Sequence, residues 1–349
     1  MNVYFGGPDK PTYFLRNLLA EKIDEIGENG EIFWITYYFR DFILAEKLVN
    51  AADRGVEVTV LLEASPRVKN ANQEVINLLK SSDRLNVKAI RHIKPHRHLF
   101  SSIPKIHEKL YYFRNNNEAC AFIGSFNPSG RANDDPEIVE LIGDQDRGHN
   151  FLVKIDDKLL LDNLYEHCVY MRNIKHGFVE NIKRWKSHIE SEGTLIYFFP
   201  WAKKSVIFNY LKKATKGDRL YIAVSHFTSI AVVYNLIKLA KKGVEIKVIS
   251  HDTKRRFPLK IEKLLNNFDI SCIRYDHPNK YPMHNKFIIL KKNECPLVAF
   301  GSMNLTVRSI DESHEIFCIT NKLSIVNEFK LRWNSLEKEI ISSNYSSVT

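Results

Sequence analysis

Two short motifs recur in the same order and at the same spacing, and this repeat constrains the fold more than any other feature of the chain. Each copy begins with His-x-Lys, and Gly-Ser-x-Asn follows it, with 17 positions from the His to the Gly. The copies are His107-Glu108-Lys109 with Gly124-Ser125-Phe126-Asn127, and His284-Asn285-Lys286 with Gly301-Ser302-Met303-Asn304. Either motif alone arises easily by chance, but two ordered sets at identical spacing indicate an internal duplication.

The segments before the motifs repeat as well, as a strand, a helix and a second strand in each half. The strands are short apolar runs, and the helices have a helical apolar period. The three pairs of segments are 31–37 and 219–225, 43–52 and 230–240, and 54–61 and 242–249. In the last pair, Gly55 and Gly243 fit the C-terminal end of the preceding helix. We therefore expect two units, each with a parallel or mixed sheet covered by helices on both faces.

The offset between the halves locates their boundary. The strand pairs lie 188 residues apart and the His-x-Lys motifs 177 apart, so the connection before the motif is longer in the first half. A polar stretch at 188–193 follows a helical region from about 158 to 186. We place an N-terminal lobe at 1–190 and a C-terminal lobe at 191–349, and we expect them to pack together because no Pro/Gly-rich linker separates them.

The net charge of +10 and the pI near 9.2 favour polyanionic partners, with nucleic acid first and an anionic membrane surface second. Basic residues gather at 91–98 and at 252–256, each after a predicted strand, where an α/β sheet gathers its site. Most of the other lysine pairs fit an ordinary solvated helix face.

Several features predict a cytoplasmic protein. No window approaches 18 uninterrupted apolar residues, and the N-terminal segment lacks the pattern of a signal peptide. The five cysteines contain no Cys-x-x-Cys motif, which favours free thiols in a reducing compartment. Because both motif sets lie in one chain, we expect a monomer.

The repeated side chains suit an attack on a phosphodiester. One imidazole can serve as the nucleophile and the other as the acid, while cations, hydroxyls and amides hold the phosphoryl oxygens. The candidate catalytic residues are His107, Lys109, Ser125, Asn127, His284, Lys286, Ser302 and Asn304. We expect no cofactor and no metal ion, since Asp134 and Asp135 fit a turn before Pro136 better than a metal-binding pair.

The duplicated motifs resemble the signature of the phospholipase D superfamily over about residues 30–320. The resemblance implies an α/β protein with two similar lobes, packed pseudo-symmetrically around one active site. It also implies a covalent phosphohistidine, with His107 as nucleophile and His284 as acid and base, although the near-symmetric halves leave the reverse assignment open. The superfamily includes phospholipases, cardiolipin and phosphatidylserine synthases, metal-independent nucleases and tyrosyl-DNA phosphodiesterases.

The chain departs from the family pattern in one respect and is ambiguous in another. The Asp that often lies seven residues after each His is replaced by Arg114 and Lys291, which indicates a divergent branch more than an inactive enzyme. A Glu about a dozen residues after the second Asn commonly orients a catalytic imidazole in the family, and Glu315 matches it. In the first half Glu140 is favoured over Glu137, with a surface carboxylate as an equal alternative. The segment 148–153 also resembles a site, although His149 fits a turn equally well.

Three functions stay open on the sequence. A nuclease or DNA/RNA phosphodiesterase is favoured by the basic loops and by aromatic residues near basic groups. A phospholipase D or phosphatidyltransferase acting on anionic phospholipid is the alternative, because a basic face also binds lipid head groups. The third is a noncatalytic protein that keeps the fold to bind nucleic acid.

Overall fold

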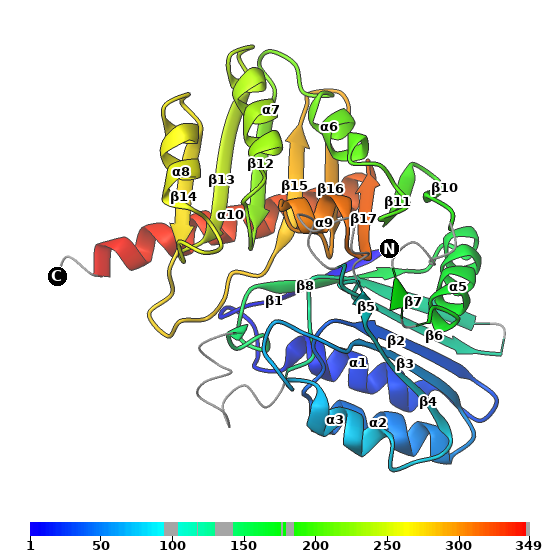
Figure 1. Cartoon of the computed structure of the whole chain (residues 1–349). Coiled ribbons are helices and arrows are strands. Elements are labelled where there is room, and N and C mark those ends of the chain that lie inside the picture. Colours follow the sequence, from blue (N-terminus) through cyan, green and yellow to red (C-terminus); the bar gives the residue numbers. More distant parts are fainter. Residues whose placement is uncertain (94–103, 117, 130–141, 176, 179–184, 347–349) are drawn as a thin grey trace.

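The computed structural model describes residues 1–93, 104–116, 118–129, 142–175, 177–178 and 185–346. Its described strands form two large mixed sheets (Figure 1). The first sheet consists, from edge to edge, of β1 (Asn2–Gly6), β8 (Asn150–Ile155), β7 (Glu118–Gly124), β6 (Leu110–Asn115), β2 (Glu31–Thr36), β3 (Glu57–Glu63) and β4 (Leu85–Ile90).

The second sheet repeats this arrangement. It consists of β10 (His188–Ser191), β11 (Thr194–Phe199), β17 (Glu315–Thr320), β16 (Leu297–Gly301), β15 (Lys286–Lys291), β12 (Arg219–Val224), β13 (Glu245–His251) and β14 (Ser271–Tyr275). The run from β8 to β4 corresponds strand for strand to the run from β17 to β14. In each run the last three strands are parallel and the others antiparallel. The predicted fold of two similar lobes is confirmed. A short pair, β5 (His92–Ile93) with β9 (Gly177–Phe178), lies outside both sheets.

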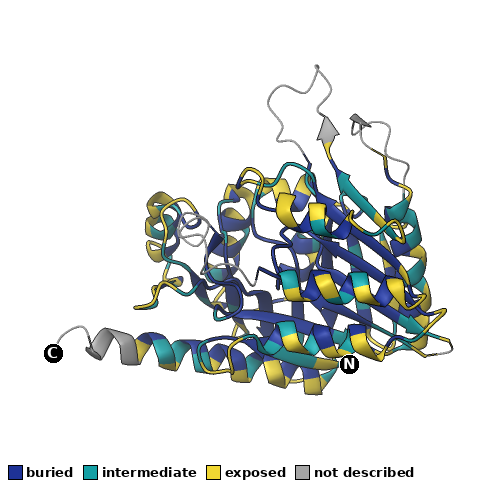
Figure 2. Ribbon diagram, turned by 90° about the horizontal axis from the view of Figure 1, so that it is seen from below, coloured by how far each residue is buried: buried dark blue, intermediate teal, exposed yellow. Residues whose placement is uncertain are grey.

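Helices cover the outer faces of the two sheets, while the inner faces enclose a shared core. The helices are α1 (Phe14–Glu25), α2 (Phe42–Asp53), α3 (Gln73–Leu79), α5 (Lys158–Arg172), α6 (Ser205–Leu211), α7 (Ile230–Ala240), α8 (Leu259–Asn266), α9 (Val307–Asp311) and α10 (Leu323–Ser346). The first three pack on the first sheet and α6, α7 and α8 on the second. Figure 2 shows that the strands are mostly buried and that each of these helices exposes one face to solvent.

The shared core joins side chains of both sheets. Phe33 and Val153 of the first sheet belong to one apolar cluster with Ile196 and Phe300 of the second. Helices α5 and α10 complete the cluster, and Phe329 of α10 lies 5.3 Å from the ring of Phe151 and 5.1 Å from that of Phe300. Burial of these side chains removes apolar surface of both lobes from water, so hydrophobic packing holds the two lobes together.

The repeat is visible at the helix ends. Asp41 and Ser229, which are 188 residues apart, cap α2 and α7 by accepting from Leu44 N (2.9 Å) and Val232 N (3.5 Å). The predicted C-terminal glycines are confirmed, because Gly55 and Gly243 have φ of +95° and +86°. The expected helix from about 158 to 186 is wrong beyond Arg172, where α5 ends and the extended β9 follows.

The predicted lobe boundary after residue 190, the monomer and the cytoplasmic location stay predictions. β10, which begins at His188, already pairs within the second sheet. No described helix has the length and apolar content that a membrane span requires.

The glycine of each Gly-Ser-x-Asn motif is required by the close approach of the next strand. A Cβ atom on Gly124 would overlap the carbonyl oxygen of Phe151, and one on Gly301 would overlap that of Ile316. Both obstacles are backbone atoms, which cannot rotate away. The serine that follows each glycine therefore sits at a fixed place beside the neighbouring strand.

We predict that Gly124→Ala and Gly301→Ala each lower the free energy of unfolding by about 1–3 kcal/mol, because the strands must separate to admit the methyl group. Urea unfolding followed by circular dichroism measures the loss. Gly27→Ala is the control, since its nearest atom outside the local chain is Asn115 Oδ1 at 3.8 Å, and it should change stability by less than about 0.5 kcal/mol. Equal stability of all three variants would contradict this account.

Candidate active site

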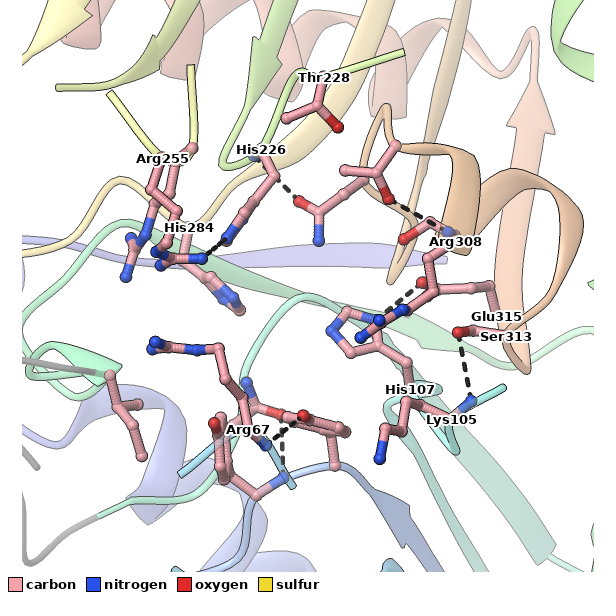
Figure 3. A pocket seen from close by; sticks show the side chains of 18 of the residues that line it. Arg67, Lys105, His107, His226, Thr228, Arg255, His284, Arg308, Ser313 and Glu315 are labelled. Atoms are coloured by element: carbon pink, nitrogen blue, oxygen red, sulfur yellow. Dashed lines mark hydrogen bonds and ion pairs between the residues drawn. The ribbon is translucent and has the colours of Figure 1, made fainter. Parts of the chain in front are cut away.

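A cavity of about 290 Å³ opens where the parallel strands β2, β3, β12 and β13 end (Figure 3). Both halves of the chain line it. The first half supplies His107 and Asn127, and the second supplies His284, Asn304 and Glu315. The structure thus brings these predicted residues, which are far apart in the sequence, to one pocket.

His107 is bonded to a carboxylate of the other half. Its Nδ1 lies 2.8 Å from Oε1 and 2.9 Å from Oε2 of Glu315, the first residue of β17. The backbone fixes this approach, because the amide of His107 donates to the carbonyl of His314 (3.0 Å). A carboxylate oxygen accepts, so Nδ1 carries the proton and Nε2 is left for the pocket.

His284 is bonded to an amide of the other half. Its Nδ1 lies 2.9 Å from Oδ1 of Asn150, the first residue of β8. The Nδ2 of Asn150 donates to the carbonyl of Gln145 (2.9 Å), so Oδ1 is the atom that faces the imidazole. The amide of His284 donates to the carbonyl of His149, and the amide of His149 to that of Pro282, both at 2.9 Å. His149 thus orders this contact through its backbone.

Asn150 occupies in the first half the place that Glu315 occupies in the second. Each residue begins the strand beside the Gly-Ser-x-Asn strand, and each is bonded to the motif serine. Ser125 Oγ lies 3.3 Å from Asn150 Oδ1, and Ser302 Oγ lies 2.5 Å from Glu315 Oε2. Glu140, the residue predicted for this role, lies outside the described residues. The connection between β7 and β8 is longer than the one between β16 and β17, so equal counts from the motif Asn do not reach equivalent strand positions in the two halves. The role of Glu140 stays a prediction.

The two motif serines are fully buried and lie outside the described pocket lining. This differs from the expectation that their hydroxyls hold the phosphoryl oxygens. Ser125 Oγ accepts from the amide of Phe151, and Ser302 Oγ accepts from that of Ile316, both at 3.0 Å. Each hydroxyl therefore links the strand that follows to the group that holds the imidazole. This places the serines behind the histidines and away from a ligand.

The motif lysines are buried beside the histidines. Lys109 Nζ donates to the carbonyl of His107 (2.6 Å), and Lys286 Nζ donates to that of His284 (2.8 Å). Burial lowers the pKa of Lys109 to about 7, although Glu315 raises it. Burial and the nearby Lys109 hold the pKa of Lys286 well below its usual value. An anion in the pocket would favour the charged form of both.

Burial also lowers the pKa of both imidazoles. The pKa of His107 falls to about 4, with Glu315 opposing the fall. The pKa of His284 lies well below its usual value, since burial is joined there by Lys286, Lys109 and Arg256, without a carboxylate to oppose them. Both rings are therefore neutral in the free protein near pH 7, which leaves Nε2 unprotonated.

The motif asparagines face backbone amides that the sequence analysis missed. Asn127 Oδ1 accepts from the amide of Tyr38 (3.5 Å), and Asn304 Oδ1 accepts from that of His226 (3.2 Å). Tyr38 and His226 are 188 residues apart and both line the pocket. Aligning the halves at that offset identifies them as a pair, although a tyrosine and a histidine share no obvious chemistry.

The two replacements of the family Asp lie away from the pocket, at the far ends of β6 and β15. Arg114 forms an ion pair with Glu31 (2.6 Å), and Lys291 is exposed. Strands rise about 3.3 Å per residue, so seven residues put this position on the order of 20 Å from the histidine. These two positions therefore contribute no side chain to the described pocket lining.

A family model described as cardiolipin synthase, PLD-like domain, matches residues 23–158 and 207–336, once in each half. The chain belongs to the phospholipase D superfamily. Members of this superfamily act on phosphodiesters, and the two matches coincide with the two motif sets. A search of curated protein sequences found no match.

Solved structures share the two-lobed fold at low sequence identity. Phosphatidylserine synthase from Haemophilus influenzae Rd KW20 is 12% identical with a TM-score of 0.62, and the match covers 97% of this chain and 86% of that one. Polyphosphate kinase from Porphyromonas gingivalis is 14% identical with a TM-score of 0.61, and the match covers 96% of this chain. The chain spans half the length of that kinase.

We predict that the two imidazoles respond in opposite ways to exchange of their partners. Glu315→Gln removes the carboxylate that raises the pKa of His107, so this pKa falls further. Asn150→Asp adds a carboxylate beside His284, so its pKa rises. In the unaltered protein both rings stay neutral near pH 7. NMR of ¹³C-labelled histidine, recorded as a function of pH, measures all of these values.

Glu108→Gln is the matched control for this titration. Glu108 is another buried carboxylate bonded to a histidine, His167, at 2.9 Å, and it does not line the pocket. Its replacement should leave the titration of both pocket imidazoles unchanged. A pocket imidazole that titrates near pH 6.5 in the unaltered protein would show that the site is more open to water than its burial indicates.

Proposed function

We propose that this protein cleaves phosphodiesters without a metal ion, through a covalent phosphohistidine on His107, and that its substrate is nucleic acid. The observation that carries the proposal is the pair of imidazoles. Each has its Nδ1 bonded to the other half of the chain, and both line the same pocket. Two rings held in this way can attack a phosphorus atom and protonate the leaving oxygen.

In the first step, Nε2 of His107 attacks phosphorus as the bond to the leaving oxygen breaks. His284 donates the proton of its Nε2 to that oxygen. The phosphorylated ring of His107 becomes positively charged, and the carboxylate of Glu315 balances this charge, which the amide of Asn150 beside the other ring cannot do. The partners therefore favour His107 as the nucleophile.

In the second step, His284 takes a proton from water, and the water oxygen attacks phosphorus while the N–P bond breaks. Because His284 donates a proton in the first step, its ring must be protonated when the substrate binds. Burial, Lys286 and Lys109 keep its pKa low in the free protein. The negative charge of a bound phosphodiester counters the two lysines and lets the ring take up its proton.

Cations of the protein take the place of a metal ion in this proposal. Lys109 and Lys286 are buried beside the histidines, outside the described pocket lining, and each donates to a histidine carbonyl. An ammonium group has three donors, so in this proposal each also holds a nonbridging oxygen of a phosphodiester that reaches past the imidazoles. Loss of one such donor typically costs about 3–4 kcal/mol of transition-state stabilisation. Glu315 is the only carboxylate among the described residues that line the pocket, and it is engaged with His107.

The lining favours nucleic acid as the substrate. Arg67, Arg255, Arg256 and Arg308 line the pocket, and together with the net charge of +10 they suit a polyanion. Tyr37 and Tyr38 also line the pocket, but both are buried in a small apolar cluster, so the arginines carry the preference for nucleic acid.

A phospholipid is the second candidate substrate. It is favoured by the description of the matching family model, a cardiolipin synthase domain, and by the fold shared with phosphatidylserine synthase. A phosphatidyl group would react at the same imidazole, with an alcohol in place of water. The cationic lining supports this candidate less, because acyl chains need an apolar surface.

We predict that the unaltered protein cleaves single-stranded DNA or RNA in EDTA at pH 6, below the pKa of about 7 for Lys109. His107→Ala should lower the rate about 10³-fold or more, since the nucleophile is lost. Labelled single- and double-stranded DNA and RNA, separated on gels, measure both rates and identify the preferred strand.

His188→Ala is the matched control, because His188 lies exposed on β10 outside the pocket, and its replacement should leave the rate unchanged. Phospholipid vesicles, anionic and zwitterionic, are treated in parallel. Release of a head group without cleavage of nucleic acid would select the second candidate. No reaction with either substrate would contradict the enzyme proposal and leave a noncatalytic binding protein.

A further inference from the structure

Three arginines gather on one side of the pocket, and the proposed chemistry does not use them. This arginine cluster consists of Arg67, Arg255 and Arg256, all of which line the pocket. Figure 3 shows Arg67 directed from the opposite wall toward Arg255, on the side where His284 lies, whereas His107 and Glu315 lie on the other side. Arg255 Nη1 also lies 3.2 Å from Nε2 of His226.

Two of these arginines are equivalent in the repeat. Arg67 follows β3 and Arg255 follows β13, and they are 188 residues apart, the same offset as the strands before them. Both are exposed at the mouth of the pocket. The next position holds Val68 in the first half and Arg256 in the second. Arg256 therefore adds a third cation to a symmetric pair and makes this side of the pocket unlike the other.

Arg256 is buried without the partners that a buried guanidinium requires. Its side chain lines the pocket while the residue keeps 6% of its surface exposed. Among the described residues, neither its Nε nor its Nη1 has a hydrogen-bond partner. Burial of an unpaired charge is costly, so such a group indicates a missing anion.

The backbone holds Arg256 in this position. The carbonyl of Arg256 accepts from the amide of Phe227 (2.8 Å), and its amide donates to the carbonyl of Thr253 (2.9 Å). Arg274 donates from behind to the carbonyls of Asp252 (2.6 Å) and Phe257 (2.7 Å). These bonds hold the loop at both ends and keep the backbone of Arg256 beside the pocket that its side chain lines.

The described carboxylates nearest to Arg256 are bonded to other residues. Glu315, the carboxylate of the described lining, is bonded to His107. Asp252 acts on Arg256 from a distance but is bonded to His251 at 2.5 Å. Burial, Arg255 and Arg67 together lower the pKa of Arg256 to about 9. Three guanidiniums that repel one another are stabilised when an anion binds between them.

We infer that the arginine cluster is a subsite for a second phosphoryl group of the substrate, next to the phosphodiester that the two histidines attack. The inference rests on the proposed function for the identity of the reacting phosphodiester. The substrate is then a phosphodiester with another phosphate attached nearby. That phosphate comes either from the adjacent nucleotide of a nucleic-acid strand or from a diphosphate linkage, and both present the same oxygens to guanidinium groups.

Binding of three thymidine nucleotides tests the subsite without any reaction. Isothermal titration calorimetry compares thymidine 5′-monophosphate with thymidine 3′,5′-bisphosphate and thymidine 5′-diphosphate. The full chain should bind at least one of the doubly phosphorylated ligands about tenfold or more tightly than the monophosphate. The 3′,5′-bisphosphate is preferred if the second group is that of a neighbouring nucleotide, and the 5′-diphosphate if it belongs to a diphosphate.

Arg256→Gln should remove this preference and leave monophosphate binding within about threefold. Arg255→Gln, at an exposed position, should reduce the preference in the same direction, which keeps the test valid if the buried variant unfolds. Lys254→Gln is the control, because it removes the same charge from the same loop at an exposed position that does not line the pocket.

The inference is overturned if neither doubly phosphorylated ligand binds more tightly than the monophosphate. It is also overturned if folded Arg256→Gln and Arg255→Gln proteins both keep the full preference. Absence of nucleic-acid and lipid cleavage, with the binding preference intact, would instead contradict the proposed function and leave the subsite standing.

Discussion

The structure depends on a reciprocal contact between its halves. Glu315 of the second half holds His107 of the first, and Asn150 of the first half holds His284 of the second. The hydrogen bond at the Nδ1 of each imidazole comes from the other lobe, so the pocket geometry depends on the packing of the two sheets. The apolar core between the sheets, completed by α5 and α10, is therefore also what aligns the histidines. Stability and site geometry are coupled through one interface.

The duplication supplies a symmetric frame, and a few substitutions make the two sides chemically different. Glu315 and Asn150 occupy equivalent places, but only the carboxylate of Glu315 can balance a positive charge on an imidazole. Arg256 is the counterpart of Val68 in the second half, and it adds a cation on the side of His284. The two imidazoles thus have different charges around them on similar backbones, and the proposed mechanism assigns the nucleophile and the acid from this difference.

The sequence predicted the parts that depend on local pattern. The repeated strands, helices and glycines follow from apolar periods and turn chemistry. The meeting of both histidines at one pocket was implied by the resemblance to the phospholipase D superfamily. The sequence did not predict Asn150 as the partner of His284, because the contact joins residues far apart across the lobe interface and the connection lengths differ between halves. The loop at 252–256 was recognised as basic, but the burial of Arg256 depends on tertiary packing that no local pattern records.

Identification of the phosphorylated residue tests the central claim most directly. The His284→Ala variant lacks the base for the second step and the acid for the first, so it is mixed with bis(4-nitrophenyl) phosphate, whose nitrophenolate leaves without a proton. The reaction is stopped in alkali, the protein is digested, and the peptides are analysed by mass spectrometry. The account predicts a phosphoryl adduct on Nε2 of His107, since Nδ1 is held by Glu315. An adduct on another residue, or release of the chromophore by the unaltered protein with no adduct in the variant, would contradict it.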